Sequence, residues 1–111
     1  MLKTDSSPKN RSALDYPATA FLAKTLGDEN RLRIIMTLRG GKKPVSRIVE
    51  ELGISQPLVS HHLKELKRAM LVAVERDGPF VFYELADRRI LTILADLDCL
   101  ATDLLTRRTV F

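Results

Sequence analysis

The sequence has little of what several classes of protein require. Its single cysteine, Cys99, excludes a disulfide within the chain and fits a reducing compartment. No apolar run approaches the roughly 20 residues that a membrane-spanning helix needs. The first residues, Met1 to Asp5, lack the apolar segment of a signal peptide. We therefore expect a cytoplasmic protein with no membrane partner.

Signs of catalysis are missing as well. The sequence shows no nucleophile paired with a base, no paired carboxylates in a loop and no glycine-rich phosphate loop. The two histidines, His61 and His62, are adjacent, and neighbours on a helix point about 100° apart, so they cannot easily share one ion. We predict that the protein is not an enzyme and needs no cofactor.

Length and charge limit the remaining classes of protein. At 111 residues the chain makes one domain with a thin hydrophobic core, which subunit association would supplement. The net charge of +4 is weak evidence for a nucleic-acid partner by itself. The distribution of charge along the chain is more informative. Residues 31–49 contain six basic and no acidic residues, whereas acidic residues gather within 87–105. A positive field is expected around residues 31–49.

Turn and capping residues divide the chain into segments. We predict a flexible N-terminal arm over residues 1–16, a folded domain over 17–106 and a short tail over 107–111. Proline, glycine and aspartate at helix ends place three helices, from Pro17 to Gly27, from Asp28 to Gly40 and Gly41, and at about 46–52.

The stretch from Leu52 to Leu66 is the most informative part of the chain. It predicts the end of one helix, a tight turn with Gly53 in a left-handed conformation, and a second helix capped by Ser55. Pro57 lies in the first turn of that helix, where proline is tolerated. The apolar stripe of this fourth helix is predicted to be Val59, Leu63, Leu66 and Met70. This layout is typical of a helix-turn-helix that places its second helix in the DNA major groove.

A hairpin and a long helix complete the pattern. Two strand-like runs, 71–76 and 80–85, flank Asp77-Gly78, a strong hairpin signal, and Pro79 is expected at the beginning of its strand. The last helix, about 87–106, is too apolar to lie alone on a small domain. We predict a mainly α fold with one β-hairpin, a winged helix-turn-helix of order α-α-α-α-β-β-α.

One face of the predicted fourth helix carries polar side chains. Gln56, Ser60 and Lys64 recur at every fourth position and therefore share that face. Glutamine pairs with adenine, and serine reaches several base edges. Lysine binds phosphate, a contact that positions the protein on DNA without specifying the base sequence. The predicted base-reading residues are Gln56, Pro57, Ser60 and His61. The predicted contacts to the DNA backbone are Ser55, His62, Lys64, Lys43, Arg47, Arg76 and Gly78. The alternative is a solvated polar face on a core helix.

Taken together, these segments resemble the ArsR/SmtB family of winged-helix repressors of bacteria and archaea. The likeness is carried by LGDENRLRII at 26–35, ELGISQ at 51–56, VSHHLKEL at 59–66 and VFYEL at 81–85, and it covers about residues 18–106. The resemblance implies a DNA-reading fourth helix and a hairpin wing beside the minor groove. It also implies a homodimer, held by the first and last helices, on an imperfect inverted-repeat operator in double-stranded DNA.

The apolar last helix calls for a dimer independently, because a two-fold partner would bury its wide stripe. Two reading helices would then address half-sites about one DNA turn, roughly 34 Å, apart. The predicted interface residues are Phe21, Leu22, Ile93, Leu94, Leu97, Leu100, Ala101 and Leu104.

Many members of the family sense metals, but this chain departs from both familiar sites. Where one site has Cys-Val-Cys, the sequence reads Pro44-Val45-Ser46, which offers no thiolate. The other, Asp-x-His followed by His-x-x-Glu, would start at Asp96-Leu97-Asp98, and its second half would begin near Thr109, just before Phe111. We expect no metal site of either type, and the inducer stays unidentified.

Several residues keep two interpretations. Cys99 is a small packed or semi-exposed residue or, through a pair across a dimer, a redox sensor. Phe80 and Phe82 pack on the domain or its partner, or they shape the wing or a small apolar pocket. Arg31 and Arg33 carry surface charge or contact phosphate.

Two functions follow from these patterns. The first is a sequence-specific DNA-binding transcriptional regulator, a repressor that binds an inverted repeat as a homodimer. The alternative is a winged-helix protein-interaction module without sequence-specific DNA reading, against which the basic segment 31–49 argues.

Overall fold

The computed structural model describes residues 13–110, so most of the predicted arm over 1–16 lies outside the described residues. The helices are α1 (Tyr16–Leu26), α2 (Glu29–Thr37), the short 3-10 helix η3 (Leu38–Gly40), α3 (Val45–Leu52), α4 (Gln56–Arg68) and α5 (Arg89–Val110). The strands are β1 (Lys43–Pro44), β2 (Val72–Asp77) and β3 (Phe80–Leu85). The predicted order of helices and hairpin is confirmed, with β1 as an addition.

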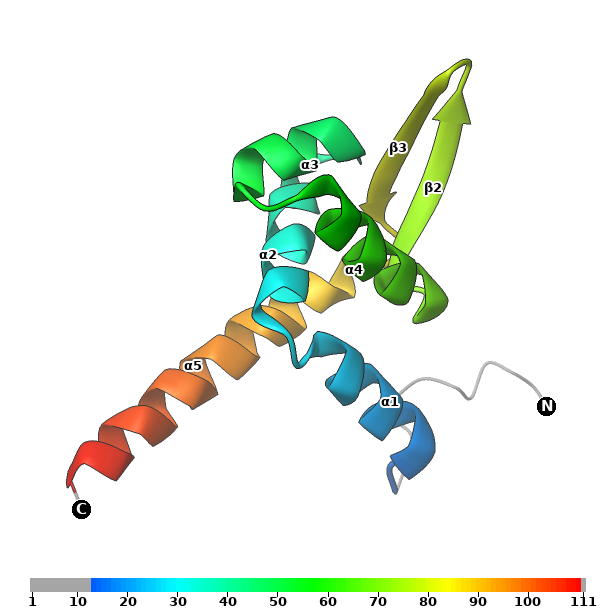
Figure 1. Cartoon of the computed structure of the whole chain (residues 1–111). Coiled ribbons are helices and arrows are strands. Elements are labelled where there is room, and N and C mark those ends of the chain that lie inside the picture. Colours follow the sequence, from blue (N-terminus) through cyan, green and yellow to red (C-terminus); the bar gives the residue numbers. More distant parts are fainter. Residues whose placement is uncertain (1–12, 111) are drawn as a thin grey trace.

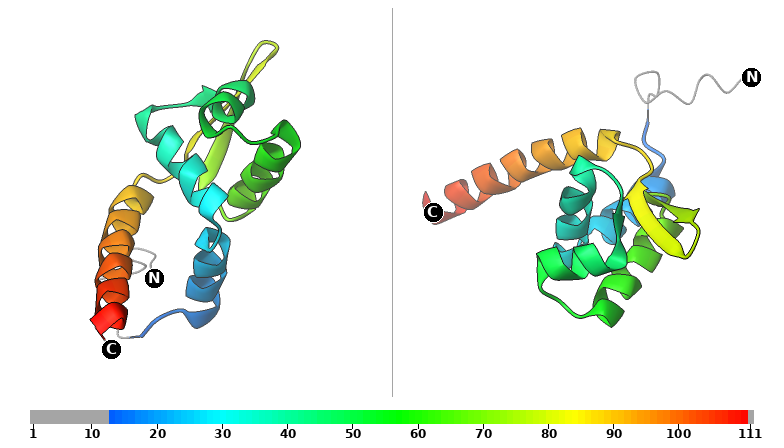
Figure 2. Two further views of the ribbon diagram at one scale, coloured as in Figure 1. Left: turned by 60° about the vertical axis from the view of Figure 1, so that its left-hand side comes forward. Right: turned by 90° about the horizontal axis from the view of Figure 1, so that it is seen from above.

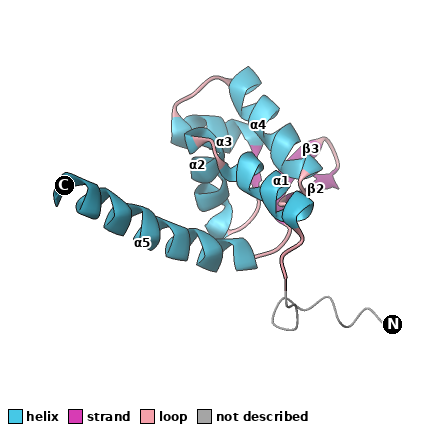
Figure 3. Ribbon diagram, turned by 90° about the horizontal axis from the view of Figure 1, so that it is seen from below, coloured by secondary structure: helices cyan, strands magenta, loops and turns pink. Residues whose placement is uncertain are grey.

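The elements form a helical body from which two parts project. The β2–β3 hairpin extends from one side, and α1 and α5 lie at the opposite end (Figures 1 and 2). Most of α5 runs beyond the body as a single long helix (Figure 3). In the part of the chain that is described, no helix is both long and apolar enough to cross a bilayer.

Local capping explains where the helices begin. The Asp28 carboxylate accepts hydrogen bonds from the N–H groups of Asn30 and Arg31 at the start of α2, as the sequence predicts. Asp15 does the same for α1, where its carboxylate accepts from the Ala18 N–H over 3.1 Å. The first helix therefore begins at Tyr16, one residue before the expected Pro17.

The hydrophobic core lies where α2, α3 and α4 meet the base of the hairpin and the first turns of α5. Its fully buried side chains are Ile34, Ile35, Leu38, Ile48, Val59, Leu63 and Leu66. From the last helix only Ile90 and Leu94 join this cluster. The core thus holds α4 firmly from one side and leaves most of α5 outside.

A three-stranded antiparallel sheet of order β1-β3-β2 supports the hairpin. Lys43 pairs with Tyr83 and Pro44 with Phe82, so β1 is an edge strand, one of the few places where a proline fits a sheet. This strand was not predicted, because two residues carry no periodic pattern.

Three details differ from prediction. Pro79 lies in the turn and not at the start of a strand, because Asp77 pairs directly with Phe80 across Gly78-Pro79. Met70 is 78% exposed and outside the apolar stripe, because α4 ends before it and its φ of 63° turns the chain away. The last helix begins at Arg89 and continues to Val110, so it includes nearly all of the expected tail over 107–111.

Candidate nucleic-acid interface

The turn between α3 and α4 sets the direction of α4. Gly53 ends α3 with a φ of 70°, a conformation that glycine adopts without steric cost, and its N–H donates to the Val49 carbonyl over 2.8 Å. Two residues later, Ser55 Oγ accepts a hydrogen bond from the Leu58 N–H at 3.3 Å and caps α4. The predicted helix-turn-helix is therefore present.

One face of α4 is open to solvent. The predicted base-reading residues Gln56, Pro57, Ser60 and His61 are all exposed on it, and Lys64 continues the face one turn later. Within the described residues, the side chains of Gln56, Ser60 and Lys64 form no hydrogen bond or ion pair. Their polar groups are available to a partner, and their contacts to DNA stay a prediction.

His62 points the other way. The residue is 5% exposed, its Nδ1 accepts a hydrogen bond from Arg31 Nε over 3.1 Å, and its Nε2 lies 3.7 Å from Asp28 Oδ1. This burial contradicts the predicted phosphate contact. The physical reason is periodicity, because position 62 follows buried Val59 by three residues and precedes buried Leu66 by four.

Arg31 is a residue whose role the sequence analysis missed. It was expected to carry surface charge or bind phosphate, but its guanidinium is half-buried between α1 and α4. Besides the bond to His62, Arg31 Nη1 donates to the Thr25 carbonyl over 3.3 Å. The sequence did contain one signal for such a contact. His62 lies at the spacing of the buried residues of α4, and a buried polar ring needs a hydrogen-bond partner.

Two of the predicted backbone contacts, Lys43 and Arg47, lie in an ion-pair network at the foot of α3. Lys43 Nζ donates to both carboxylate oxygens of Glu51, at 2.7 and 2.9 Å, and Arg47 Nε donates to Oε2 at 3.2 Å. Thr37 Oγ1 also donates to Glu51. The positive field expected around residues 31–49 is partly neutralised here.

The hydrogen bonds from Lys43 and Thr37 lower the pKa of Glu51 from 4.5 to about 2. A carboxyl whose pKa falls on folding contributes stability that is complete above its ordinary pKa and is lost as the pH falls toward the lower value. The network is therefore intact at neutral pH and breaks only in strong acid.

The wing, residues 72–85, carries the other predicted backbone contacts. Arg76 and Gly78 are exposed near its tip, and Gly78 turns the chain with a φ of 62°. Phe80 is 61% exposed, and its ring centroid lies 6.4 Å from that of Phe82. Lys42 Nζ lies 5.2 Å from the Phe82 ring centroid, a cation–π contact, so Phe82 packs on its own domain.

Much of α5 presents apolar side chains that nothing in the described protomer covers. Ile93, Leu97, Leu100 and Leu104 follow one another at spacings of four, three and four, and each is about half exposed. This is the spacing of a helix seam that packs on another helix. Two other predicted interface residues, Leu94 and Leu22, contribute to the protomer's own core instead, with Leu94 only 9% exposed.

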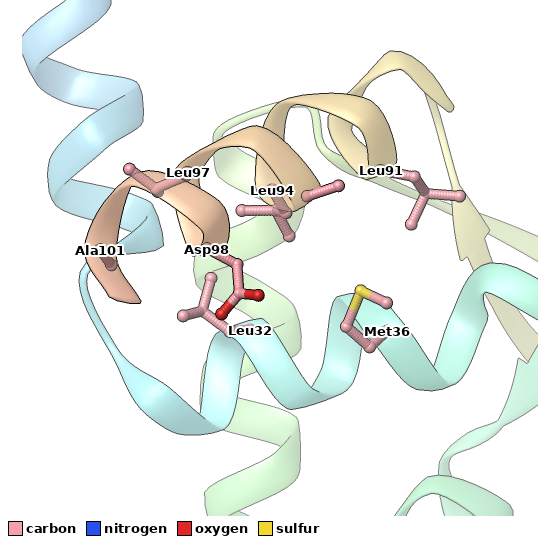
Figure 4. A pocket seen from close by; sticks show the side chains of 8 residues that line it. Leu32, Met36, Leu91, Leu94, Leu97, Asp98 and Ala101 are labelled. Carbon is pink, nitrogen blue, oxygen red and sulfur yellow. The ribbon is translucent and has the colours of Figure 1, made fainter. Parts of the chain in front are cut away.

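An open pocket of about 570 Å³ lies between α2 and α5 (Figure 4). Leu32 and Met36 of α2 face Leu94, Leu97 and other apolar side chains of α5, and Asp98 provides the carboxylate at its edge. The pocket joins the exposed seam, so the same partner surface would cover both. Elsewhere, the described side chains include no group of three or more His, Cys, Asp or Glu residues placed to hold a metal ion.

Comparison with known proteins agrees with this geometry. The sequence model of the bacterial regulatory protein arsR family matches residues 28–74, from the cap of α2 to β2. The HTH-type transcriptional repressor SmtB of Mycobacterium tuberculosis is 40% identical over 93 residues, which are 84% of this chain and 67% of the repressor.

Solved structures give the same result. The crystal structure of Rv0081 of M. tuberculosis matches with a TM-score of 0.75 and 29% identity, over 88% of this chain and 99% of the other. A homodimeric winged helix-turn-helix DNA-binding domain from Mycobacterium bovis, described as a possible ArsR-family regulator, matches with a TM-score of 0.71 and 25% identity, over 85% and 92% of the two chains.

Proposed function

Because this chain belongs to the ArsR family of bacterial regulatory proteins, we propose that it is a transcriptional repressor that reads duplex DNA as a homodimer. The observation that carries the proposal is the exposed face of α4, on which Gln56, Ser60 and Lys64 have no partner among the described residues. Gln56 and Ser60 read bases in the major groove, with Pro57 and His61 beside them, and Lys64 binds phosphate.

The dimer forms through α1 and α5. The exposed seam of α5 and the half-exposed Phe21 belong to the two helices, α5 and α1, that lie at the end of the molecule opposite the wing (Figure 1). A two-fold partner would bury these side chains and present both α4 helices to one side of the DNA, at half-sites about 34 Å apart. The wing, with Arg76 and Gly78 at its tip, lies along the DNA backbone.

The direct test is selection of bound genomic fragments, followed by fluorescence anisotropy on the selected duplex and on a scrambled one. A repressor of this kind binds the selected duplex far more tightly, and its affinity falls steeply with salt. Equal affinity for all duplexes at physiological salt would refute sequence reading. Dimerisation with no binding to any fragment would favour a protein-interaction module.

Substitutions on α4 separate the roles of its side chains. Gln56→Ala is expected to lower discrimination between the selected and the scrambled duplex by about 1–3 kcal/mol per half-site, since a bidentate base contact is lost. Lys64→Ala is expected to weaken binding to both duplexes alike and to reduce the salt slope by about 1 per half-site. The control is Lys24→Ala, an exposed charge removed from α1. Equal loss on both duplexes for Gln56→Ala would contradict its assignment.

Glu51→Gln tests the backbone contacts of Lys43 and Arg47. It removes the carboxylate that pairs with both side chains, so they become free to bind phosphate. We expect stronger binding to all duplexes and a salt slope steeper by about 0.9 for each freed cation that reaches a phosphate. Glu29→Gln, which frees Arg33 from an exposed pair on α2, is the matched control. An unchanged slope would remove Lys43 and Arg47 from the interface.

A further inference from the structure

A polar cluster inside the protomer joins α1, α2 and α4. Arg31, on α2, stands at its centre and donates through Nε to His62 Nδ1 of α4 and through Nη1 to the Thr25 carbonyl of α1. Thr25 lies in the last turn of α1, where carbonyl groups have no partner within the helix. One guanidinium therefore satisfies the end of α1 and a buried ring on α4 together.

The geometry requires a neutral His62. Its Nδ1 accepts a hydrogen bond from a group that is always charged, so the proton of the ring resides on Nε2, which faces Asp28 Oδ1 at 3.7 Å. That carboxylate oxygen already accepts the N–H groups of Asn30 and Arg31 and is held in place by them. A proton on Nδ1 would set two donors and two positive charges against each other.

We propose that Arg31 is a positioning residue that holds the recognition helix α4 against the end of α1, and that it does so only while His62 is neutral. Because α1 belongs to the proposed dimer interface, the contact couples dimer geometry to the direction of the DNA-reading face. The DNA readout of this inference rests on the proposed function, whereas the readouts on the free protein do not.

Burial and the neighbouring charges together set the pH range over which the contact between Arg31 and His62 holds. Burial is the main cause that lowers the pKa of His62 below 6.5; Asp28 opposes it, and Arg31 and His61 act with it. A histidine whose pKa falls on folding contributes stability that is complete above about 6.5, its unfolded pKa, and lost as the pH falls through the folded value. The contact is therefore complete at pH 7.5 and is lost as the pH falls below 6.5 and His62 takes up a proton.

The test uses the full chain without DNA and compares wild type, Arg31→Lys and His62→Asn. Lysine keeps the charge but lacks the rigid fork that places Nε and Nη1 at the two acceptors, so a single ammonium is not held against both. Asparagine keeps an acceptor close to the position of Nδ1 and does not titrate. Arg33→Lys is the matched control, because Arg33 is exposed on the same helix and, among residues 13–110, pairs only with Glu29.

Two measurements on the free protein decide the proposal. Imidazole nitrogen shifts should show the His62 proton on Nε2 at pH 7.5 and a titration below 6.5. Hydrogen-exchange protection of α4 amides should fall about tenfold in Arg31→Lys and, in wild type, about tenfold as His62 titrates. His62→Asn should keep its protection across that pH range, and Arg33→Lys should match wild type. Wild type alone supplies the pH result if a variant does not fold.

The DNA measurement then follows discrimination between the selected and scrambled duplexes from pH 8 to 5. We expect a roughly tenfold loss for Arg31→Lys at pH 7.5, a similar loss for wild type in acid, and a flatter profile for His62→Asn. Unchanged protection in Arg31→Lys, or the same acid loss in His62→Asn, would overturn the proposal. If wild type fails to discriminate between the two duplexes at any pH, the result counts only against DNA reading. The contact between Arg31 and His62 is still tested by hydrogen exchange on the free protein.

Discussion

Replacing Leu97 and Leu100 with glutamate is expected to leave the protein monomeric and to weaken binding to an inverted-repeat duplex by about 100-fold or more. Both side chains belong to the α5 seam and are 48% and 51% exposed in the protomer, so the fold itself loses little. In a two-fold dimer each substitution occurs twice and buries charge without a partner, which costs several kcal/mol per ion. The monomer also loses the gain of about 10² to 10⁴ that two linked half-sites provide.

Sedimentation velocity gives the mass of this variant and fluorescence anisotropy gives its affinity. Cys99→Glu is the matched control, because it adds an acid to an exposed position of the same helix on the side away from the seam. We expect this control to remain dimeric and to bind DNA. A dimeric Leu97→Glu, Leu100→Glu protein with wild-type affinity would show that subunits associate through another surface.

Leu63→Ala is expected to have the largest effect on stability, a loss of about 3 kcal/mol in the free energy of unfolding. Leu63 lies on the inner face of α4 and is fully buried in the cluster formed with α2 and α3. Truncation removes its transfer free energy and leaves a cavity, which costs about 2–5 kcal/mol for leucine. Domains of this size are only about 5–15 kcal/mol stable, so the melting temperature should fall by about 15 °C.

Leu58→Ala is the matched control for this experiment. Leu58 is on the same helix but 38% exposed, so its truncation should cost well under half as much. Chemical denaturation with urea measures both variants. Equal losses for the two positions would mean that the inner face of α4 is not the packed face.

Much of the fold follows from local chemistry. A capping aspartate before α2 and a capping serine before α4 predict helix starts that the structure confirms, because each side chain serves N–H groups only two or three residues away. The periodicity of Val59, Leu63 and Leu66 predicts the buried face of α4 for the same reason. The end of that stripe was wrong at Met70, where the chain leaves the helix through a left-handed residue.

Other features depend on partners far away in the sequence. Strand β1 exists only because β3, some forty residues later, passes beside it. Lys43 of β1 meets Glu51 of α3, and Arg31 of α2 meets His62 of α4, because separate elements pack together. The local pattern does not predict which residues form such pairs. The exposed positions Gln56, Ser60 and Lys64 were accessible to sequence reasoning because helical spacing alone places them on one face.

The order of elements, the helix-turn-helix and the outward face of α4 all follow from local sequence, since each depends on residues within a few positions of one another. Which charged side chains remain free depends instead on how the elements pack in three dimensions. This packing pairs Lys43 with Glu51 and buries His62 against Arg31, because it brings distant side chains within hydrogen-bond distance. The pair of Arg47 with Glu51, by contrast, joins neighbouring turns of α3 and is local. The proposed DNA-reading face is thus local in origin, whereas the charge around it and the orientation of its helix are properties of the whole fold.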